Sequence, residues 1–239
     1  MSTFKADLFE ICNEVAAKFP GWSFVSGQFK NKTLKHTDLL IHPGFAFRQG
    51  TTPVQPSVVV YNKRADILTR RIFGGGSPVS SVSLQVVAHT LKHTPEKLRL
   101  GFWIVQNKEV FLSVGQPSQA VRDTTLDVAE SHSALIAMME DGISFIESHY
   151  DLSTEESLLR ALPAKYTTRH ANSPYDEMDR WKGVMVCVIH VLLGDFDFVD
   201  RYLSDDFETI FPKRIDDLEK IVAVMPDLKR RYADTGCVI

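Results

Sequence analysis

The most suggestive spacing for chemistry in this chain is a basic helix-like run, Lys63 to Arg71, followed directly by small residues. Arginine binds phosphate through two parallel hydrogen bonds, and glycine lets backbone amides approach an anion closely. The candidate anion-binding residues are Arg70, Arg71, Gly75, Gly76 and Ser77. A phosphate-binding loop, however, precedes its helix, whereas these glycines follow one, where the helix dipole repels an anion. Anion binding is therefore the weaker alternative.

Histidines offer two further possibilities, a metal site and a general base. His89 and His93 are four residues apart, but a structural metal site needs three or four ligands and no third is evident nearby. His132 and His190 fall within apolar helical patterns, where a neighbouring carboxylate could make a general base. Such histidines are more often core residues that bond a backbone carbonyl. We therefore expect no metal and no cofactor.

Catalytic motifs are missing from the sequence. It contains no Gly-x-Ser-x-Gly, no Gly-x-Gly-x-x-Gly and no Gly-Lys-Ser/Thr, and none of the three cysteines has a histidine at a telling distance. These absences remove the usual starting points for a hydrolase, a kinase or a dinucleotide-binding enzyme. We expect no catalytic residue, and a protein without catalytic activity is favoured over an enzyme, which stays open as the alternative.

Charge is distributed unevenly along the chain, although the net charge is only -3. Residues 1–110 hold 14 Lys and Arg against 7 Asp and Glu, whereas residues 141–211 hold 6 against 14. Opposite fields accelerate and select protein encounters, so the acidic part is a candidate docking face for a basic protein. The alternative is that the charges are solvated or attract each other within the chain. The candidate partner-binding residues are Asp195, Asp197, Asp200, Asp205, Asp206 and Glu208.

Nucleic acid is a less suitable partner. Aromatic residues do alternate with lysines in the basic part, at Phe29, Lys30, Lys32, Lys35 and Phe47. The overall acidity weakens attraction to phosphate, and these aromatic residues alternate as core residues would. We expect no nucleic-acid partner.

The elements that position these residues indicate an α+β protein. Helical spacing predicts an N-terminal helix over 4–19, and a period of two predicts strands between residues 22 and 61. A short helix over 63–73 and strands over 79–88, 98–105 and 110–114 follow, the last two forming a hairpin. Few strands are separated by helices, so we expect a mainly antiparallel sheet of five or six strands.

One long central helix is predicted over residues 117–150. Pro117 and Ser118 fit its start, and apolar residues recur at steps of three, four and seven. This stripe consists of Val121, Val128, Leu135, Ile136, Met139, Ile143 and Ile146. The expected organisation is a sheet domain over 1–116, the central helix over 117–150 and a helical part over 151–239, which could also form one continuous domain.

The helical part should contain four helices, over 153–162, 173–193, 195–203 and 213–225. Ser173, Pro174 and Asp176 make a strong start for the second of these, and Gly194 a stop. Its valines from Val184 to Val191 predict a helix buried nearly all round.

The chain carries no signal-peptide pattern and no apolar run long enough to cross a membrane. Its three cysteines, Cys12, Cys187 and Cys237, are odd in number and far apart. This pattern suits a reducing compartment, so we expect a cytoplasmic protein without a membrane partner.

A small basic sheet domain followed by an acidic helical part, without catalytic motifs, resembles bacterial immunity proteins of contact-dependent and type VI secretion toxin systems. The resemblance is one of architecture and charge. It implies a protein that binds one cognate toxin tightly, often over the toxin's active site, and neutralises it. The alternative is a ligand-binding protein or enzyme with a cleft between sheet and helices, binding an anion around Arg70 to Ser77.

Overall fold

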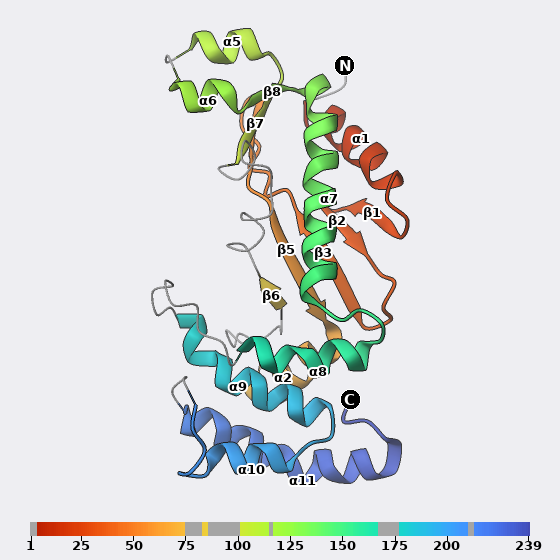
Figure 1. Cartoon of the computed structure of the whole chain (residues 1–239), viewed down its shortest axis with the longest axis vertical. Coiled ribbons are helices and arrows are strands. Elements are labelled where there is room, and N and C mark those ends of the chain that lie inside the picture. The colour runs from red at the N-terminus through yellow and green to blue at the C-terminus, as the bar shows by residue number, and fades with distance from the viewer. Residues whose placement is uncertain (1–3, 75–82, 86–100, 115–116, 167–176, 210–212) are drawn as a thin grey trace. The chain divides into compact units, whose positions relative to one another are not determined.

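The computed structural model describes residues 4–74, 83–85, 101–114, 117–166, 177–209 and 213–239, and within them the chain is an α+β protein (Figure 1). The predicted class is confirmed, with an N-terminal helix, a mainly antiparallel sheet and a helical C-terminal part. Two compact units are present. The sheet unit comprises Met1–Thr33, Asp38–Tyr61 and Leu84–His149, and the helical unit comprises Leu34–Thr37, Asn62–Ser83 and Tyr150–Ile239.

The larger sheet has five strands in the order β1-β2-β3-β5-β6. They are β1 (Trp22–Val25), β2 (Gln28–Asn31), β3 (Thr37–His42), β5 (Ser57–Asn62) and β6 (Ser83–Gln85). Strands β1, β2 and β3 pair antiparallel, with Phe29 opposite both Phe24 and Ile41. Phe29 and Ile41 are fully buried, so this register places the large apolar side chains of adjacent strands in the core.

A second sheet has three strands in the order β4-β7-β8, namely β4 (Thr51–Val54), β7 (Phe102–Val105) and β8 (Thr125–Asp127). Strand β4 pairs antiparallel with β7, but β8 pairs parallel with it. The predicted hairpin between 98–105 and 110–114 is therefore wrong. The partner of β7 on that side is a strand from inside the region predicted to be one long helix.

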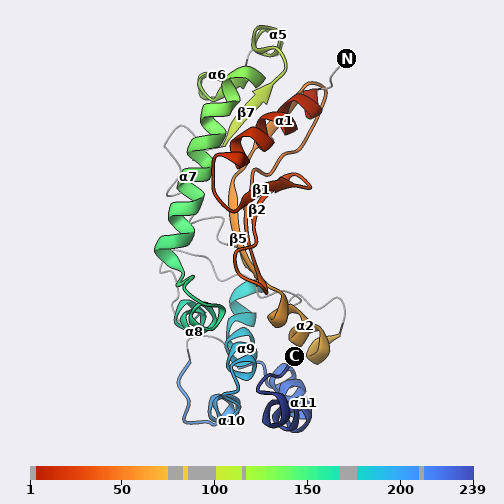
Figure 2. The same cartoon turned by 90° about the vertical axis from the view of Figure 1, so that its right-hand side faces the viewer.

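Two helices of the sheet unit cover this framework, α1 (Phe4–Ala17) and α7 (Ser131–His149) (Figure 2). They contact each other, and α1 also contacts β1. The buried face of α1 carries Leu8, Cys12 and Val15, as its spacing predicts. Helix α7 approaches β3 closely, since a Cβ on Gly142 would lie 2.6 Å from Cδ1 of Ile41.

The predicted central helix is confirmed only over α7. Residues before it form α6 (Gln119–Asp123), β8 and a 3-10 turn, η1 (Val128–Glu130). The hydroxyls of Thr124 and Thr125 donate to carbonyls one turn back, at 2.8 and 2.6 Å, and the chain then leaves the helix. The amide of Asp127 donates to Oε2 of Glu130 at 3.1 Å and starts the next turn. The apolar periodicity continues across this break and conceals it.

The strand predicted over 110–114 is instead a helix, α5 (Lys108–Ser113). Oδ1 of Asn107 accepts from the amide of Val110 at 2.9 Å, and Oδ1 of Asp127 accepts from the amide of Lys108 at 2.8 Å. These carboxylate and amide oxygens satisfy amides that a helix start leaves without partners. Two side-chain caps thus outweigh the strand propensity of Val110 and Phe111.

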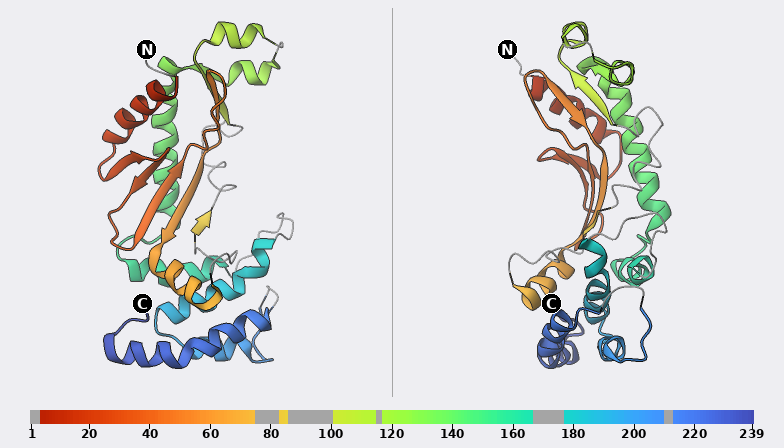
Figure 3. Two further views of the ribbon diagram at one scale, coloured as in Figure 1. Left: turned by 180° about the vertical axis from the view of Figure 1, so that it is seen from behind. Right: turned by 90° about the vertical axis from the view of Figure 1, so that its left-hand side faces the viewer.

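The helical unit contains α2 (Lys63–Phe73), α8 (Glu155–Tyr166), α9 (Glu177–Leu192), α10 (Asp197–Leu203) and α11 (Ile215–Thr235). Figure 3 shows α10 and α11 beside α9, which contacts α2, α8, α10 and α11. The described part of α9 is buried from Val184 to Ile189, as predicted. The predicted start at Ser173 lies outside the described residues. Helix α11 continues ten residues beyond its predicted end, past Pro226 to Thr235.

Candidate functional site: the acidic segment and its surroundings

The acidic segment, residues 195–208, runs from the end of α9 through α10 into the chain that follows it. Asp197 and Asp200 lie on α10, a short helix held by buried residues on its opposite side, whereas Asp205, Asp206 and Glu208 follow the helix. Val199 and Tyr202 are 0% and 3% exposed, and the hydroxyl of Tyr202 would lie 2.1 Å from a Cβ placed on Gly183 of α9. Glycine at position 183 therefore lets α10 approach α9, and the anchored face of α10 directs its polar face to solvent.

Five of the six candidate partner-binding acids are exposed, as the sequence predicts, and Asp195 is half-buried. Within the residues that the structure describes, the five exposed acids form no ion pair. They are Asp197, Asp200, Asp205, Asp206 and Glu208. The segment therefore presents negative charge that the described residues do not neutralise. Whether these acids bind a partner remains a prediction.

Asp195 differs from the other five because it has ion-pair partners among the described residues. Its Oδ2 lies 2.9 Å from Nδ1 of His190 and 3.8 Å from Nη2 of Arg201. The His190 ring stacks on Phe198, with 3.5 Å between centroids and 4° between planes. Burial lowers the pKa of His190 below its ordinary value, and the hydrogen bond and charge of Asp195 offset part of that effect. The sequence pattern leaves the role of His190 open and does not indicate its pairing with Asp195.

The described residues give little support to the alternative of an anion-binding site. Arg70 pairs with Asp66 at 3.0 Å within α2, and the amide of Gly74 bonds the carbonyl of Arg70 at 2.8 Å. With its φ of 78°, Gly74 terminates the helix at its negative end. Arg71 is exposed. The other three candidates, Gly75, Gly76 and Ser77, lie outside the described residues.

The remaining histidine candidates do not assemble a site. His89 and His93 lie outside the described residues, and His132 is half-buried near the start of α7. In the part of the chain that the structure describes, no group of three or more His, Cys, Asp or Glu side chains could hold a metal ion. Cys12 and Cys187 are buried free thiols, and burial raises the pKa of each to about 12. Both are inert in this state.

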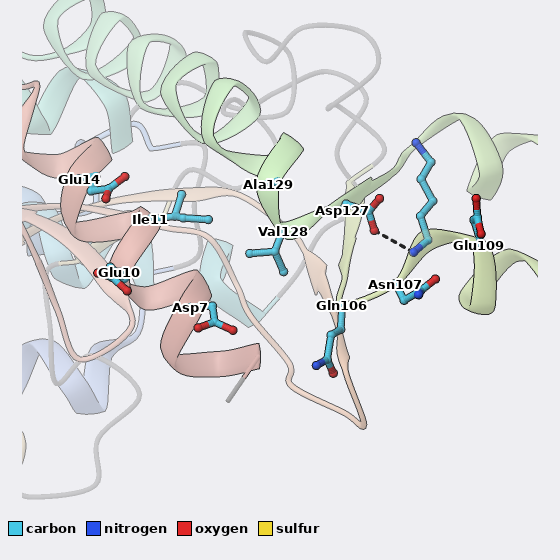
Figure 4. Close-up of a pocket in the computed structure, with 11 residues that line it drawn as sticks. Asp7, Glu10, Ile11, Glu14, Gln106, Asn107, Glu109, Asp127, Val128 and Ala129 are labelled. Carbon is cyan, nitrogen blue, oxygen red and sulfur yellow. Dashed lines mark hydrogen bonds between the residues drawn. The ribbon is translucent and has the colours of Figure 1, made fainter. Parts of the chain in front are cut away.

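An open pocket of about 730 Å³ in the sheet unit was not predicted (Figure 4). One wall is a face of α1 carrying Asp7, Glu10, Ile11 and Glu14, whose steps of three and four place them in one stripe. The other walls are residues 106–109 and 127–129. Only Lys108 is basic, and it pairs with Glu130 at 3.4 Å. The spacing of the acids on α1 can be seen in the sequence. The opposite walls of the pocket come from residues about 100 or more positions later in the chain, so the sequence does not indicate the pocket itself.

Comparisons with known proteins identify no relative of this chain. No family model, no curated protein and no solved structure matches the chain. Among the described residues, no helix is both long enough and apolar enough to cross a membrane.

Proposed function

We propose that this protein is a non-catalytic binding protein whose acidic segment docks on a basic protein partner. The observation that carries the proposal is a set of five exposed carboxylates, two on α10 and three in the chain directly after it, without ion-pair partners among the described residues. Val199 and Tyr202 anchor α10. Such a surface attracts a basic partner over a distance of about one Debye length, roughly 8 Å at physiological salt. It also repels acidic competitors, which gives selectivity.

The resemblance to bacterial immunity proteins supplies the finer proposal. In that reading the partner is a toxin domain with a basic groove, and the acidic segment occupies the groove and excludes the toxin's substrate. The location of this activity would be the cytoplasm, where the free thiols of Cys12 and Cys187 stay reduced.

The test begins with affinity capture from the cells that encode the protein, followed by calorimetry with the captured partner. The test variant replaces four exposed acids by amides: Asp197→Asn, Asp200→Asn, Asp205→Asn and Asp206→Asn. A matched control removes the same charge from the pocket of the sheet unit: Asp7→Asn, Glu10→Gln, Glu14→Gln and Glu109→Gln. Both variants change net charge equally, so only the position of the charge differs.

We expect the acidic-segment variant to lose at least tenfold in affinity, about 1.4 kcal/mol shared over four charges. The control variant should stay within threefold of the unmodified protein. Equal affinity losses in both variants would show that net charge, rather than the acidic segment, attracts the partner. A larger loss in the control would move the docking face to the sheet unit.

A further inference from the structure

The backbone at the end of α9 brings a histidine and a carboxylate together. Gly194 adopts a φ of 83°, its amide bonds the carbonyl of Val191 at 3.0 Å, and the amide of Asp195 bonds the carbonyl of His190 at 2.9 Å. This is the Schellman arrangement, which places the side chains of its first and last residues in contact. Apolar side chains usually meet there, whereas here the imidazole of His190 meets the carboxylate of Asp195.

The surroundings hold this pair in place. Phe198 of α10 stacks on the His190 ring, and Cζ of Arg201 lies 5.7 Å from the centre of the Phe198 ring. The side chain of His190 is 20% exposed, so protons reach it from solvent while its position is fixed. The pair thus lies at the start of the acidic segment, and Asp195 is one of its six acids.

We propose that His190 is a pH-sensitive switch that regulates the charge of the acidic segment, an inference that rests on the proposed function. When His190 is neutral, Asp195 is offset among the described residues only by the longer 3.8 Å contact with Arg201, and part of its charge stays available to a basic partner. Protonated His190 forms a full ion pair with Asp195, which cancels that charge and holds the carboxylate against α9. Binding of a basic partner therefore weakens as the pH falls through the histidine range, about pH 8 to pH 5.

The charged groups that face His190 are few. Asp195 comes from the turn after α9 and Arg201 from α10, and they act on the imidazole with opposite signs. Among the described residues, these two are the charged groups that shift the pKa of His190. Burial lowers the pKa of His190, so the ring takes up a proton at a lower pH than a solvent-exposed imidazole does.

The first test needs no partner. Titration of the His190 ring protons by NMR gives its pKa in the unmodified protein and in Asp195→Asn. Because Asp195 stabilises the imidazolium, we expect the pKa of His190 to fall in the variant. Asp195 is half-buried at the end of the helix, and asparagine keeps its size. An unchanged pKa of His190 would overturn the proposed switch.

The second test measures binding of poly-L-lysine between about pH 8 and pH 5, a range in which lysine stays fully charged. We expect the affinity of the unmodified protein to fall about two- to fivefold more than that of His190→Gln, as expected for one surface ion pair. His132→Gln, on α7 of the sheet unit, is the control, and its affinity for poly-L-lysine should depend on pH as that of the unmodified protein does.

Equal pH dependence in the unmodified protein and in His190→Gln would overturn the inference while leaving the proposed function intact. Failure of poly-L-lysine to bind at any pH would contradict the proposed function, and the regulatory inference would fall with it. The NMR titration separates these cases, because it reports the coupling of His190 and Asp195 without any binding step.

Discussion

At the scale of single residues, the acids of this protein differ in whether the chain supplies their counter-charges. Asp217 of α11 is a buried carboxylate that accepts from Nε of Arg214 at 2.6 Å and from Nζ of Lys220 at 2.9 Å. Burial by itself would raise the pKa of Asp217, but the hydrogen bonds from Lys220 and Arg214 outweigh it and lower the pKa. Asp217 is a structural acid. The exposed acids of the acidic segment have no such partners among the described residues.

Replacement of Asp217 by asparagine should therefore destabilise the protein. We expect Asp217→Asn to cost about 1–3 kcal/mol, because one of the two charged donors loses its acceptor oxygen and both lose the negative charge they pair with at a buried position. Its exposed neighbour gives the control, since Asp216→Asn should change the free energy of unfolding by less than about 0.5 kcal/mol. Urea unfolding of both variants measures the difference, and equal midpoints would show that the ion-pair cluster contributes nothing.

The same comparison has a defined pH dependence. A carboxylate whose pKa is lower in the folded protein contributes stability above its unfolded pKa, about 3.9, and loses it as the pH falls through the folded value. The gap between the unmodified protein and Asp217→Asn should therefore be constant near pH 7 and narrow below about pH 4. A gap that widens in acid would contradict the assigned direction.

At the scale of elements, a close contact between helices positions the acidic segment. A Cβ at position 183 of α9 would lie 2.1 Å from the hydroxyl oxygen and 3.0 Å from Cζ of Tyr202 on α10. Alanine is normally better than glycine inside a helix by about 1 kcal/mol. At this position the close approach reverses that preference, because Tyr202 is buried and must move together with α10.

Gly183→Ala should consequently destabilise the protein by about 1–3 kcal/mol in thermal or urea unfolding. The double variant Gly183→Ala with Tyr202→Phe should recover part of the loss, because removal of the hydroxyl removes the closest contact. Tyr202→Phe alone also loses the 3.1 Å hydrogen bond to Thr209. A double-mutant cycle with both single variants therefore separates the two effects. Additive effects would mean that the two side chains do not meet.

Helix α1 carries an acidic stripe whose two ends interact differently with the helix dipole. Asp7 lies in its first turn, where a negative charge is favourable, and Glu14 lies at the start of its last turn, which has no basic residue. Glu10 also lies one turn before Glu14 on the same face and repels it.

Glu14→Gln should therefore stabilise the protein by about 0.3–1 kcal/mol, and Asp7→Asn should destabilise it by a similar amount. Both variants remove one negative charge from the same pocket. Thermal unfolding at low salt measures the two shifts. Shifts of the same sign would show that the net charge of the pocket, rather than position along the helix, sets the effect.

Sequence patterns predicted the elements whose signals are local. Helices α1, α2 and the described part of α9 have clear apolar faces or glycine stops, and the exposure of Asp197 and Asp200 follows from their crowding. The break before α7 was missed because apolar spacing continues through it, while β8 is fixed by pairing with β7 from elsewhere in the chain. Tertiary pairing of this kind leaves no local signal.

The candidate site, like the fold, can be predicted from the sequence only where its signals are local. The exposed acids can be identified from their density in the sequence. The pairing of His190 with Asp195 depends instead on the geometry at the end of α9, for which Gly194 is the only sequence signal. One wall of the pocket in the sheet unit is the acidic stripe of α1, which the sequence spacing shows, and another wall is residues 127–129. Spacing within one helix can be read from a single sequence, whereas a contact between distant segments is known only from the fold.

At the scale of the whole molecule, the chain combines a small net charge with strong local imbalance. Net charge is -3, yet residues 141–211 hold 14 acids against 6 bases. A protein of this kind is attracted to a basic partner through one region rather than through its overall field, and the attraction appears mainly in the rate of association. Loss of the acidic segment should therefore change association kinetics as well as affinity.

The most direct measurement is the association rate constant of the captured partner at low and high salt. It is taken for the unmodified protein, for the fourfold variant at Asp197, Asp200, Asp205 and Asp206, and for the matched fourfold pocket variant. We expect only the acidic-segment variant to associate more slowly at low salt and to show a flatter dependence of the rate on salt. The same rate and the same salt dependence in the acidic-segment variant and the unmodified protein would contradict the account and leave those carboxylates as solvated surface charges.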